Sequence, residues 1–207
     1  PAMPQKNVSR ERRTLCVADF GKCYHDRWIF RHVEQEFHGG EPYFLDTPSG
    51  SGKTTFFRCL CGLERPEEGE VSGIDAFSVQ FQEDRLCEEY SAVKNLEMVM
   101  GDAKEARKAL TWLLPEEALG QPCHELSGGM KRRVSLVRAM EAGAQCVLLD
   151  EPFTGLDEEN REKAYEYIRT HANGRIMIAT HIRPWENMPE DVQKGEGLWK
   201  RIRETQE

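Results

Sequence analysis

The chain has 207 residues, of which 39% are hydrophobic and 31% are charged, with a formal net charge of −8. This length suits one domain with a substantial core, and the longest apolar runs, such as 146–149, are far too short to span a bilayer. The acidic balance argues against a general nucleic-acid-binding protein. The seven cysteines form no Cys-x-x-Cys pair, so we expect free thiols in a reducing cytosol.

The first part of the chain alternates short apolar runs with turns. Runs of strand-forming residues predict four strands, over residues 14–20, 28–37, 42–46 and 77–81. Apolar residues at helical spacing predict a helix that begins near Gly52 and ends near Gly62. The charged stretch 64–69 is predicted to be a turn.

Residues 47–55 are the sequence Thr-Pro-Ser-Gly-Ser-Gly-Lys-Thr-Thr, which precedes and opens this helix. Gly50, Gly52, Lys53 and Thr54 have the spacing of a phosphate-binding loop. The glycines let backbone N–H groups converge on one anion, and the helix adds the positive end of its dipole. Lys53 can reach the terminal phosphates, and the Thr54 hydroxyl can ligate Mg²⁺.

The middle of the chain, from about residue 84 to residue 143, is predicted to be mostly helical. Asp102 is a good N-cap for one amphipathic helix, and residues 128–142 are predicted to form another. Strand–helix alternation then returns, which predicts an α/β core with a mostly parallel sheet and an inserted helical segment. The later predicted elements are a strand at 146–149, a helix at 158–171, a strand at 175–180, a short helix at 184–192 and a strand at 197–202.

The apolar strand 146–149 ends in two acids, Asp150 and Glu151. A buried strand would deliver Asp150 to the sheet edge where the phosphate-binding loop also lies, and there it could hold Mg²⁺ directly or through a water. Glu151 could orient or deprotonate an attacking water. The alternative is an ordinary acidic strand end, but a phosphate-binding loop about a hundred residues upstream favours the functional interpretation.

Residues 126–130, Leu-Ser-Gly-Gly-Met, open the second predicted helix of the middle segment. Ser127 can cap it, and the glycines expose backbone N–H groups, so this helix start is a second candidate anion site. The alternative is simply a well-capped helix. One active site hardly needs two such loops, whereas two chains that met head to tail could place each phosphate-binding loop against residues 127–130 of the other.

With these motifs the chain resembles the ATP-binding cassette family, the nucleotide-binding subunits of ABC transporters, over nearly its whole length from about Thr14. Residues 47–55 correspond to the Walker A motif, 146–151 to Walker B, and 126–130 to the family signature, normally Leu-Ser-Gly-Gly-Gln. The resemblance implies a single domain, 1–207, with a RecA-like P-loop NTPase core at 8–83 and 144–207, including an N-terminal antiparallel β subdomain. It also implies an inserted α-helical subdomain at 84–143.

The resemblance also assigns roles to individual residues. Nucleotide binding would involve Tyr24, Ser49, Gly50, Ser51, Gly52, Lys53, Thr54 and Thr55, with Ser127, Gly128, Gly129 and Met130 acting in trans. The catalytic residues would be Glu151, His181 and Lys53, and the Mg²⁺ ligands Thr54, Gln82 and Asp150. Tyr24 would stack on adenine, with Phe20 as the alternative candidate. Asp157 would lie at the dimer interface and could also cap the helix at 158–171.

Each of the isolated positions has an ordinary alternative. Tyr24 could be a core aromatic, Gln82 a polar strand end and His181 a surface or core histidine. As a family residue, Gln82 would touch Mg²⁺ and couple to the membrane subunit, and His181 would hydrogen-bond the γ-phosphate and sense its loss.

Three positions depart from the family pattern. Thr47 stands where the loop has its first glycine, and a β-branched residue resists positive φ there. Met130 replaces the signature glutamine, and at this position the chain is similar to some ATPases of nitrate, sulfonate and taurine transporters. Arg132 stands where a glutamine is common, and we expect it to be solvated.

The implied function is an ATP-binding, ATP-hydrolysing subunit that uses Mg²⁺ and closes as a head-to-tail homodimer or heterodimer. It would be cytoplasmic, at the inner face of the cell membrane, with no nucleic-acid partner. It would dock on integral membrane permease subunits through the surface around Gln82 and the helical insertion. We expect only some of the apolar residues there to be exposed: Tyr90, Val93, Leu96, Met98 and Val99.

The same sequence disfavours two other classes of function, a soluble ABC-type ATPase and a module that only holds ATP. Soluble ABC-type ATPases of DNA repair carry long coiled coils, which are not seen in this sequence. Those of translation carry two cassettes in one chain, whereas this sequence shows one. The net charge of −8 also disfavours both. A module that binds ATP without turnover is disfavoured by Glu151 and His181.

Overall fold

The computed structural model describes residues 13–40, 42–45 and 50–180. The predictions for Thr47, Ser49 and His181, and for the elements at 184–192 and 197–202, lie outside these residues.

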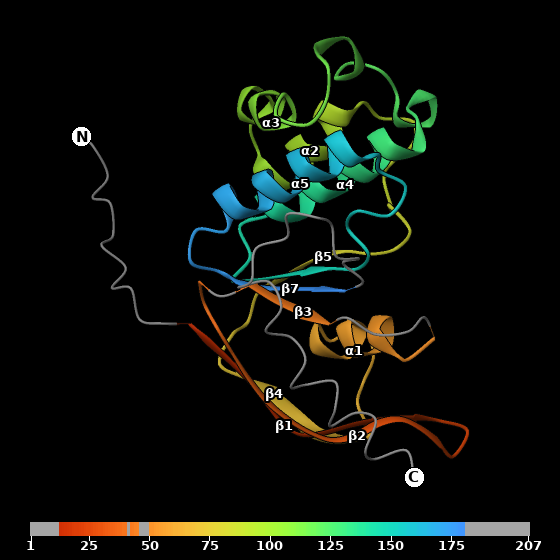
Figure 1. Cartoon of the computed structure of the whole chain (residues 1–207), viewed down its shortest axis with the longest axis vertical. Helices are drawn as coiled ribbons and strands as arrows, with labels where there is room; N and C mark the ends of the chain where they lie inside the picture. The colour runs from red at the N-terminus through yellow and green to blue at the C-terminus, as the bar shows by residue number, and fades with distance from the viewer. Residues whose placement is uncertain (1–12, 41, 46–49, 181–207) are drawn as a thin grey trace, which may run out of the picture.

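The described strands form an antiparallel sheet and a parallel sheet, with helices on both faces of the parallel one (Figure 1). The antiparallel sheet has the order β2-β1-β4, from β1 (Thr14–Tyr24), β2 (Arg27–His38) and β4 (Glu68–Ser72). The parallel sheet has the order β3-β7-β6-β5, from β3 (Pro42–Leu45), β7 (Ile176–Thr180), β6 (Cys146–Leu149) and β5 (Phe77–Gln80). The predicted α/β core with an antiparallel β subdomain is confirmed.

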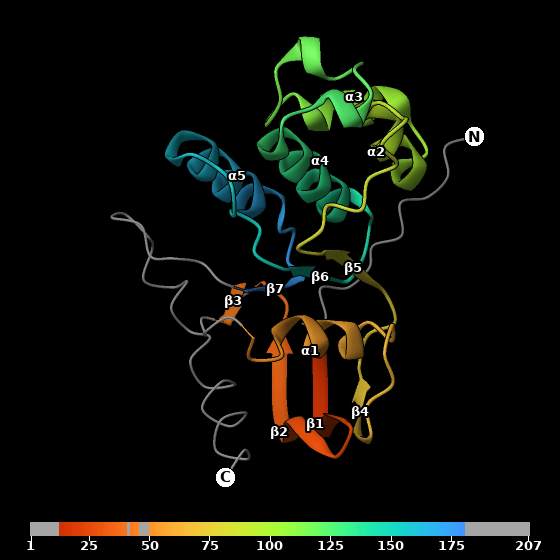
Figure 2. The ribbon, with the colours of Figure 1, turned by 90° about the vertical axis from the view of Figure 1, so that its right-hand side faces the viewer.

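Helix α1 (Lys53–Leu60) lies between the two sheets, as Figures 1 and 2 both show. The other helices are on the opposite side of the parallel sheet: α2 (Ala92–Met100), α3 (Ala103–Leu110), α4 (Gly128–Glu141) and α5 (Glu158–His171). Two short 3₁₀ turns, Glu116–Ala118 and Cys123–Glu125, connect α3 to α4. None of the helices in the described part of the chain combines the length and apolar composition that crossing a bilayer requires.

The parallel strands are buried on both faces and divide their side chains between two cores. Successive residues of a strand point to opposite faces of a sheet. Cys146 and Leu148 therefore pack with α1 and the antiparallel sheet, while Val147 and Leu149 pack with helices α2 to α5 on the other face. This alternation decides which side the first residue after β6, Asp150, will face.

Strand β4 overturns the predicted turn at 64–69, because Glu68 already begins a strand that pairs antiparallel with β1. Its only apolar residue is Val71, so local pattern could not reveal it. Gly69 has φ +76°, and a Cβ there would lie 2.2 Å from the Ala18 carbonyl oxygen. The close approach of β4 to β1 therefore needs glycine at this position.

The helix starts follow the capping residues that the sequence offers. Asp102 accepts hydrogen bonds from the backbone N–H groups of Lys104 at 2.8 Å and Glu105 at 3.2 Å, as predicted. Asp157 caps α5 by accepting from the Asn160 N–H at 2.9 Å, which confirms its predicted capping role.

Arg132 corrects the prediction of a solvated side chain, because it is only 5% exposed. Its Nη1 donates to the Phe81 carbonyl oxygen at 2.8 Å and to Asp84 Oδ1 at 3.1 Å. The guanidinium thus ties α4 to the segment that follows β5. Burial of the cation is offset by this ion pair and by the carbonyl.

All seven cysteines are free, and their environments differ sharply. Burial raises the pKa of Cys59 and of Cys146 to about 12, whereas Cys87 is exposed. Because the thiolate is the reactive form, we expect iodoacetamide at pH 8 to modify Cys87 in the native protein and to leave Cys59 and Cys146 unmodified. Mass spectrometry of digested peptides measures this. Labelling of Cys146 at the rate of Cys87 before unfolding would contradict the packing of β6.

Candidate nucleotide-binding site

A cavity of about 380 Å³ lies where the start of α1 meets the carboxyl ends of the parallel strands. This edge is where open α/β sheets bind ligands, because loops diverge there and helix N-termini point at the opening. The cavity is lined by Ile29, Gly50, Ser51, Gly52, Lys53, Thr54, Thr55, Gln82, Asp150 and Glu151.

Gly52 is required by both conformation and space at the start of α1. Its φ is +90°, in the left-handed region, and a Cβ there would lie 2.3 Å from Cγ2 of Ile29. As the N-cap residue, Gly52 has no side chain with which to cap the helix. The first N–H groups of a helix have no intrahelical partner, so those of α1 are suited to an anion in the cavity.

Lys53 lies on the cavity wall with only 7% of its surface exposed. Its Nζ is 3.5 Å from Oγ of Ser51, within the same loop. A positive charge is therefore held in the cavity next to the start of α1. Both features favour a ligand with several negative charges.

Asp150 is 2% exposed, and each of its carboxylate oxygens accepts a hydrogen bond from a threonine hydroxyl. Oγ1 of Thr54 donates to Oδ2 at 2.5 Å, and Oγ1 of Thr180 donates to Oδ1 at 2.6 Å. Asp150 follows the alternation of β6, so its side chain faces α1 as that of Leu148 does. The carboxylate thus joins α1, β6 and β7 at one point.

Thr180 is a site residue that the sequence analysis missed. It is fully buried at the end of β7, and its Oγ1 also accepts the backbone N–H of Glu151 at 3.0 Å. The alternation of Ile176, Ile178 and Thr180 in the sequence indicates that the Thr180 hydroxyl faces the α1 side of the sheet. The sequence does not indicate that β7 is the neighbour of β6, which brings this hydroxyl to Asp150.

Glu151 lies on the cavity wall with a left-handed backbone, φ +52°. Residues other than glycine seldom adopt this conformation, which is concentrated at functional sites. Its backbone N–H is held by Thr180, and its Oε2 accepts a hydrogen bond from Oγ1 of Thr154 at 3.1 Å. The turn after β6 therefore sets the direction of this carboxylate.

Tyr24 lies at the end of β1 and is 39% exposed, but it is not among the described residues that line the cavity. Its hydroxyl donates to Glu64, and Nζ of Lys22 lies 5.0 Å from the ring centroid. Stacking of Tyr24 on adenine stays a prediction. Phe20, the alternative, is fully buried and stacks on Phe30 at 5.7 Å, so it cannot offer a face to a base.

Residues 127–130 are at the start of α4 and do not line this cavity in the described part of the chain. Ser127 and Gly128 are exposed, and Oγ of Ser127 accepts the Met130 N–H at 3.3 Å. The structure thus keeps the second helix start away from its own phosphate-binding loop and open to contact.

Arg133, which the sequence analysis did not single out, connects two of the predicted interface motifs. Its Nε donates to the Gly129 carbonyl oxygen at 3.1 Å, and its Nη1 donates to Oδ1 of Asn160 at 2.7 Å. Asn160 in turn donates to both carboxylate oxygens of Asp157 at 2.9 Å. Residues 127–130 and Asp157 are therefore held in one arrangement.

Replacement of Thr180 by valine tests how Asp150 is held. The change keeps the side-chain shape and leaves Oδ1 of Asp150 and the N–H of Glu151 unpaired, so we expect the free energy of unfolding to fall by about 1–3 kcal/mol. We also expect slower ATP hydrolysis, because Glu151 loses its anchor. Urea denaturation and phosphate release measure the two effects.

Ser78→Ala is the matched control, since Ser78 donates a buried hydrogen bond to the Ala139 carbonyl oxygen at 2.7 Å, on β5 and away from the cavity. We expect a similar loss of stability with unchanged turnover. Wild-type turnover in Thr180→Val would contradict the anchoring role.

Comparison with known proteins agrees with this geometry. Residues 30–154 match the family model described as ABC transporter. Aliphatic sulfonates import ATP-binding protein SsuB 2 of Paraburkholderia xenovorans (strain LB400) is 32% identical over 190 residues, which cover 87% of this chain and 76% of the relative. Cytochrome c biogenesis ATP-binding export protein CcmA of Gluconobacter oxydans (strain 621H) is 32% identical over 179 residues, 82% of each chain.

Solved structures share the fold. The ATP-binding cassette MJ0796, in a dimeric post-hydrolysis state bound to ADP and Pi, superposes with a TM-score of 0.76 at 23% identity, over 82% of this chain and 88% of that one. A putative ABC transporter ATP-binding protein from Pyrococcus furiosus gives a TM-score of 0.74 at 22% identity, over 86% and 95% of the two chains. The matched family model, the curated relatives and the cavity together show that the chain belongs to the ABC transporter family, as an ATP-binding ATPase component.

Proposed function

We propose that the chain binds Mg·ATP in the cavity at α1, closes head to tail with a second ATPase subunit and drives separate membrane permease subunits. The observation that carries this proposal is the buried carboxylate of Asp150, held between Thr54 of the phosphate-binding loop and Thr180. This arrangement puts a fixed acid beside the phosphate site and directs Glu151 to the cavity wall.

The residues around the cavity fit Mg²⁺. Thr54, Gln82 and Asp150 all line it and offer a hydroxyl, a carboxamide and a carboxylate, the oxygen ligands that this hard cation takes together with substrate phosphates. A bound Mg²⁺ would neutralise charge on the β- and γ-phosphates. Lys53 and the first N–H groups of α1 would contribute to the same neutralisation from the protein side.

Glu151 is the residue best placed to act on the attacking water. It lies on the cavity wall at the end of β6, and its carboxylate direction is set by Thr154 and by the anchored backbone. It would accept a proton from the water or orient it, as a general base does. The γ-phosphate contact assigned to His181 lies outside the described residues and stays a prediction.

The exposed start of α4 supports the proposal of a head-to-tail dimer, homomeric or heteromeric. Residues 127–130 lie at a helix N-terminus whose first residues, Ser127 and Gly128, are exposed, which suits a phosphate, yet none of the four is among the described residues that line their own chain's cavity. A second subunit would bring its phosphate-binding loop to this helix start. Asp157, linked to the same helix through Asn160 and Arg133, would lie in that interface.

The curated relatives named above serve both import and export. The proposal therefore concerns the ATP-driven step that both directions share, at the inner face of the membrane. The similarity of Met130 to sulfonate-type ATPases stays a prediction about cargo.

Docking on the permease would use the segment that follows Gln82 and the adjoining face of α2. Tyr90, Met98 and Val99 are between 42% and 49% exposed there, while Leu96 is fully buried. This confirms the expectation that only some apolar residues of the segment are exposed. An exposed tyrosine next to the acidic side chains of Glu88 and Glu89 is suited to an amphipathic partner segment.

Replacement of Glu151 by glutamine tests the catalytic assignment. We expect hydrolysis to slow by about 10²–10⁴-fold, the usual contribution of a general base, and ATP to trap a dimer detectable by size-exclusion chromatography. Lys53→Ala is the control for binding, and calorimetry should show that it loses tight ATP affinity. Undiminished turnover in Glu151→Gln would show that another group activates the water.

Replacement of Tyr90 by aspartate tests the docking surface. An anchor tyrosine at an interface is worth about 2 kcal/mol or more, so we expect at least tenfold weaker co-purification of the permease with unchanged basal ATPase activity. Leu63→Asp is the matched control, because Leu63 is 57% exposed just beyond α1 and away from α2. Equal effects of the two changes would rule out Tyr90 as a specific contact.

A further inference from the structure

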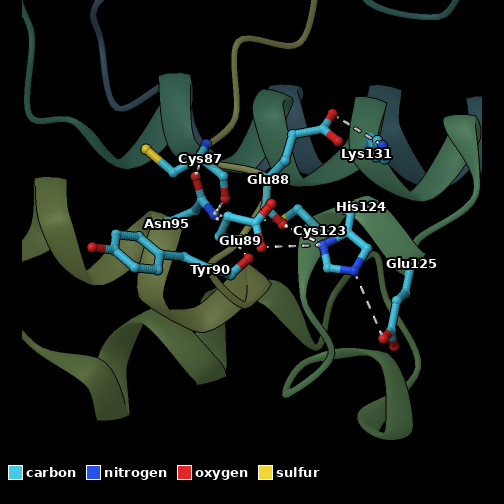
Figure 3. Close-up of polar contacts among 9 residues, drawn as sticks. All are labelled: Cys87, Glu88, Glu89, Tyr90, Asn95, Cys123, His124, Glu125 and Lys131. Carbon is cyan, nitrogen blue, oxygen red and sulfur yellow. Dashed lines mark hydrogen bonds and ion pairs between the residues drawn. The ribbon is translucent and has the colours of Figure 1, made fainter.

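The loop before α2 and the turn before α4 lie side by side (Figure 3), and backbone hydrogen bonds join them. The Cys123 N–H donates to the Tyr90 carbonyl oxygen at 2.9 Å, and the His124 N–H donates to the Glu88 carbonyl oxygen at 3.0 Å. A β-bridge between Ser91 and Pro122 extends the pairing. Residues 87–91 and 122–125 therefore form one structural unit, although they are far apart in sequence.

Asn95 of α2 is fully buried behind this unit and holds it through its side-chain amide. Its Oδ1 accepts the Cys87 N–H at 2.9 Å. Its Nδ2 lies within 3.3 Å of four acceptors, the carbonyl oxygens of Cys87, Tyr90 and Ser91 and the sulfur of Cys123. Figure 3 shows the amide directed into the loop. This one side chain contacts both paired segments, 87–91 and 122–125.

The unit leads directly into residues 127–130. The Leu126 N–H donates to the Cys123 carbonyl oxygen at 3.1 Å, and Leu126 is buried in the core shared by α2 and α4. Nζ of Lys131 forms an ion pair with Glu88 at 3.0 Å, from the first turn of α4 back to the loop. Ser127 therefore directly follows Leu126, the last residue of a turn that hydrogen bonds hold against residues 87–91.

We propose that Asn95 is a positioning residue for the ATPase reaction, which fixes residues 87–91 against residues 122–125 and thereby sets the position of Ser127–Met130. This inference rests on the proposed function, in which the start of α4 completes the nucleotide site of a second subunit. The exposed face of the same unit carries Glu88, Glu89 and Tyr90, so a contact made there would act on residues that are bonded to the turn before α4.

Asn95→Leu removes both hydrogen-bonding groups with little change of volume. We expect amide hydrogen exchange in residues 122–131 to become at least tenfold faster, because the turn loses its anchor, while residues 53–60 of α1 exchange as in the wild type. Ser91→Ala is the matched control: among the described residues, Oγ of Ser91 accepts the Lys94 N–H in α2 and makes no hydrogen bond to the turn. It should leave exchange in 122–131 within twofold.

Asn95→Asp provides a second variant with the same shape, which keeps the acceptor for the Cys87 N–H and loses the donors. It should also accelerate exchange in 122–131, and it decides the matter if the leucine variant does not fold. Unchanged exchange there in the folded variants would overturn the proposal.

A binding measurement separates this inference from the proposed function. In a Glu151→Gln background, Asn95→Asp should leave ATP affinity of the monomer within twofold and raise the dimer dissociation constant at least tenfold. An unchanged dimer dissociation constant would overturn the positioning role. If the Glu151→Gln parent forms no ATP-dependent dimer, the proposed function is wrong, and hydrogen exchange still tests whether Asn95 positions the start of α4.

Discussion

The site depends on holding one carboxyl group in a place that water hardly reaches. A buried polar group is costly unless it is hydrogen-bonded, and Asp150 is bonded by one threonine from α1 and one from the end of β7. Those partners, Thr54 and Thr180, are more than a hundred residues apart in sequence. Both hydrogen bonds to Asp150 therefore form only when β6 and β7 pair in the correct register and α1 packs beside them. The parallel pairing of Leu149 with Ala179 supplies that register. The same contact fixes the backbone of Glu151, which is why the adjacent acid has a defined direction on the cavity wall.

This dependence explains what the sequence could and could not predict. The strand 146–149 and the helix 158–171 were predicted with the bounds observed, because apolar runs and N-cap residues are local signals. Thr180 was not identified as a site residue, since its role exists only through the neighbouring strand. Strand β4 was missed because its pairing with β1, rather than its composition, makes it a strand. Arg132 was misjudged for the same reason, since its partners Phe81 and Asp84 lie on a segment some fifty residues upstream.

The start of α4 is held from two directions. On one side Arg133 connects it to the cap of α5 through Asn160. On the other, Lys131 pairs with Glu88 of the loop after β5, and Asn95 contacts both that loop and Cys123 of the turn before α4. Polar side chains make both connections. Arg133 donates to the Gly129 carbonyl oxygen, and Asn95 donates to carbonyl oxygens of the loop after β5. Apolar packing is non-directional, so it stabilises helices against each other without fixing the rotation or register of a turn. Directional contacts are needed where a helix terminus has to meet a ligand within hydrogen-bond distance.

The position of these contacts gives the proposed docking surface a short connection to the candidate nucleotide site. The loop after β5 passes Gln82 on the cavity wall and runs through Glu88 and Tyr90, whose carbonyl oxygen lies 3.3 Å from Nδ2 of Asn95. One end of the segment therefore touches the site of its own chain, and the other is bonded to the turn before α4, the helix start that the proposed dimer would place against a second chain. A displacement of this segment would act on both halves of a composite site at once, because hydrogen-bonded backbone transmits movement where a flexible linker would absorb it. Asn95 lies at the junction of the two routes, because its amide bonds the backbone of Cys87 in the loop and its amide nitrogen also contacts the sulfur of Cys123 in the turn before α4.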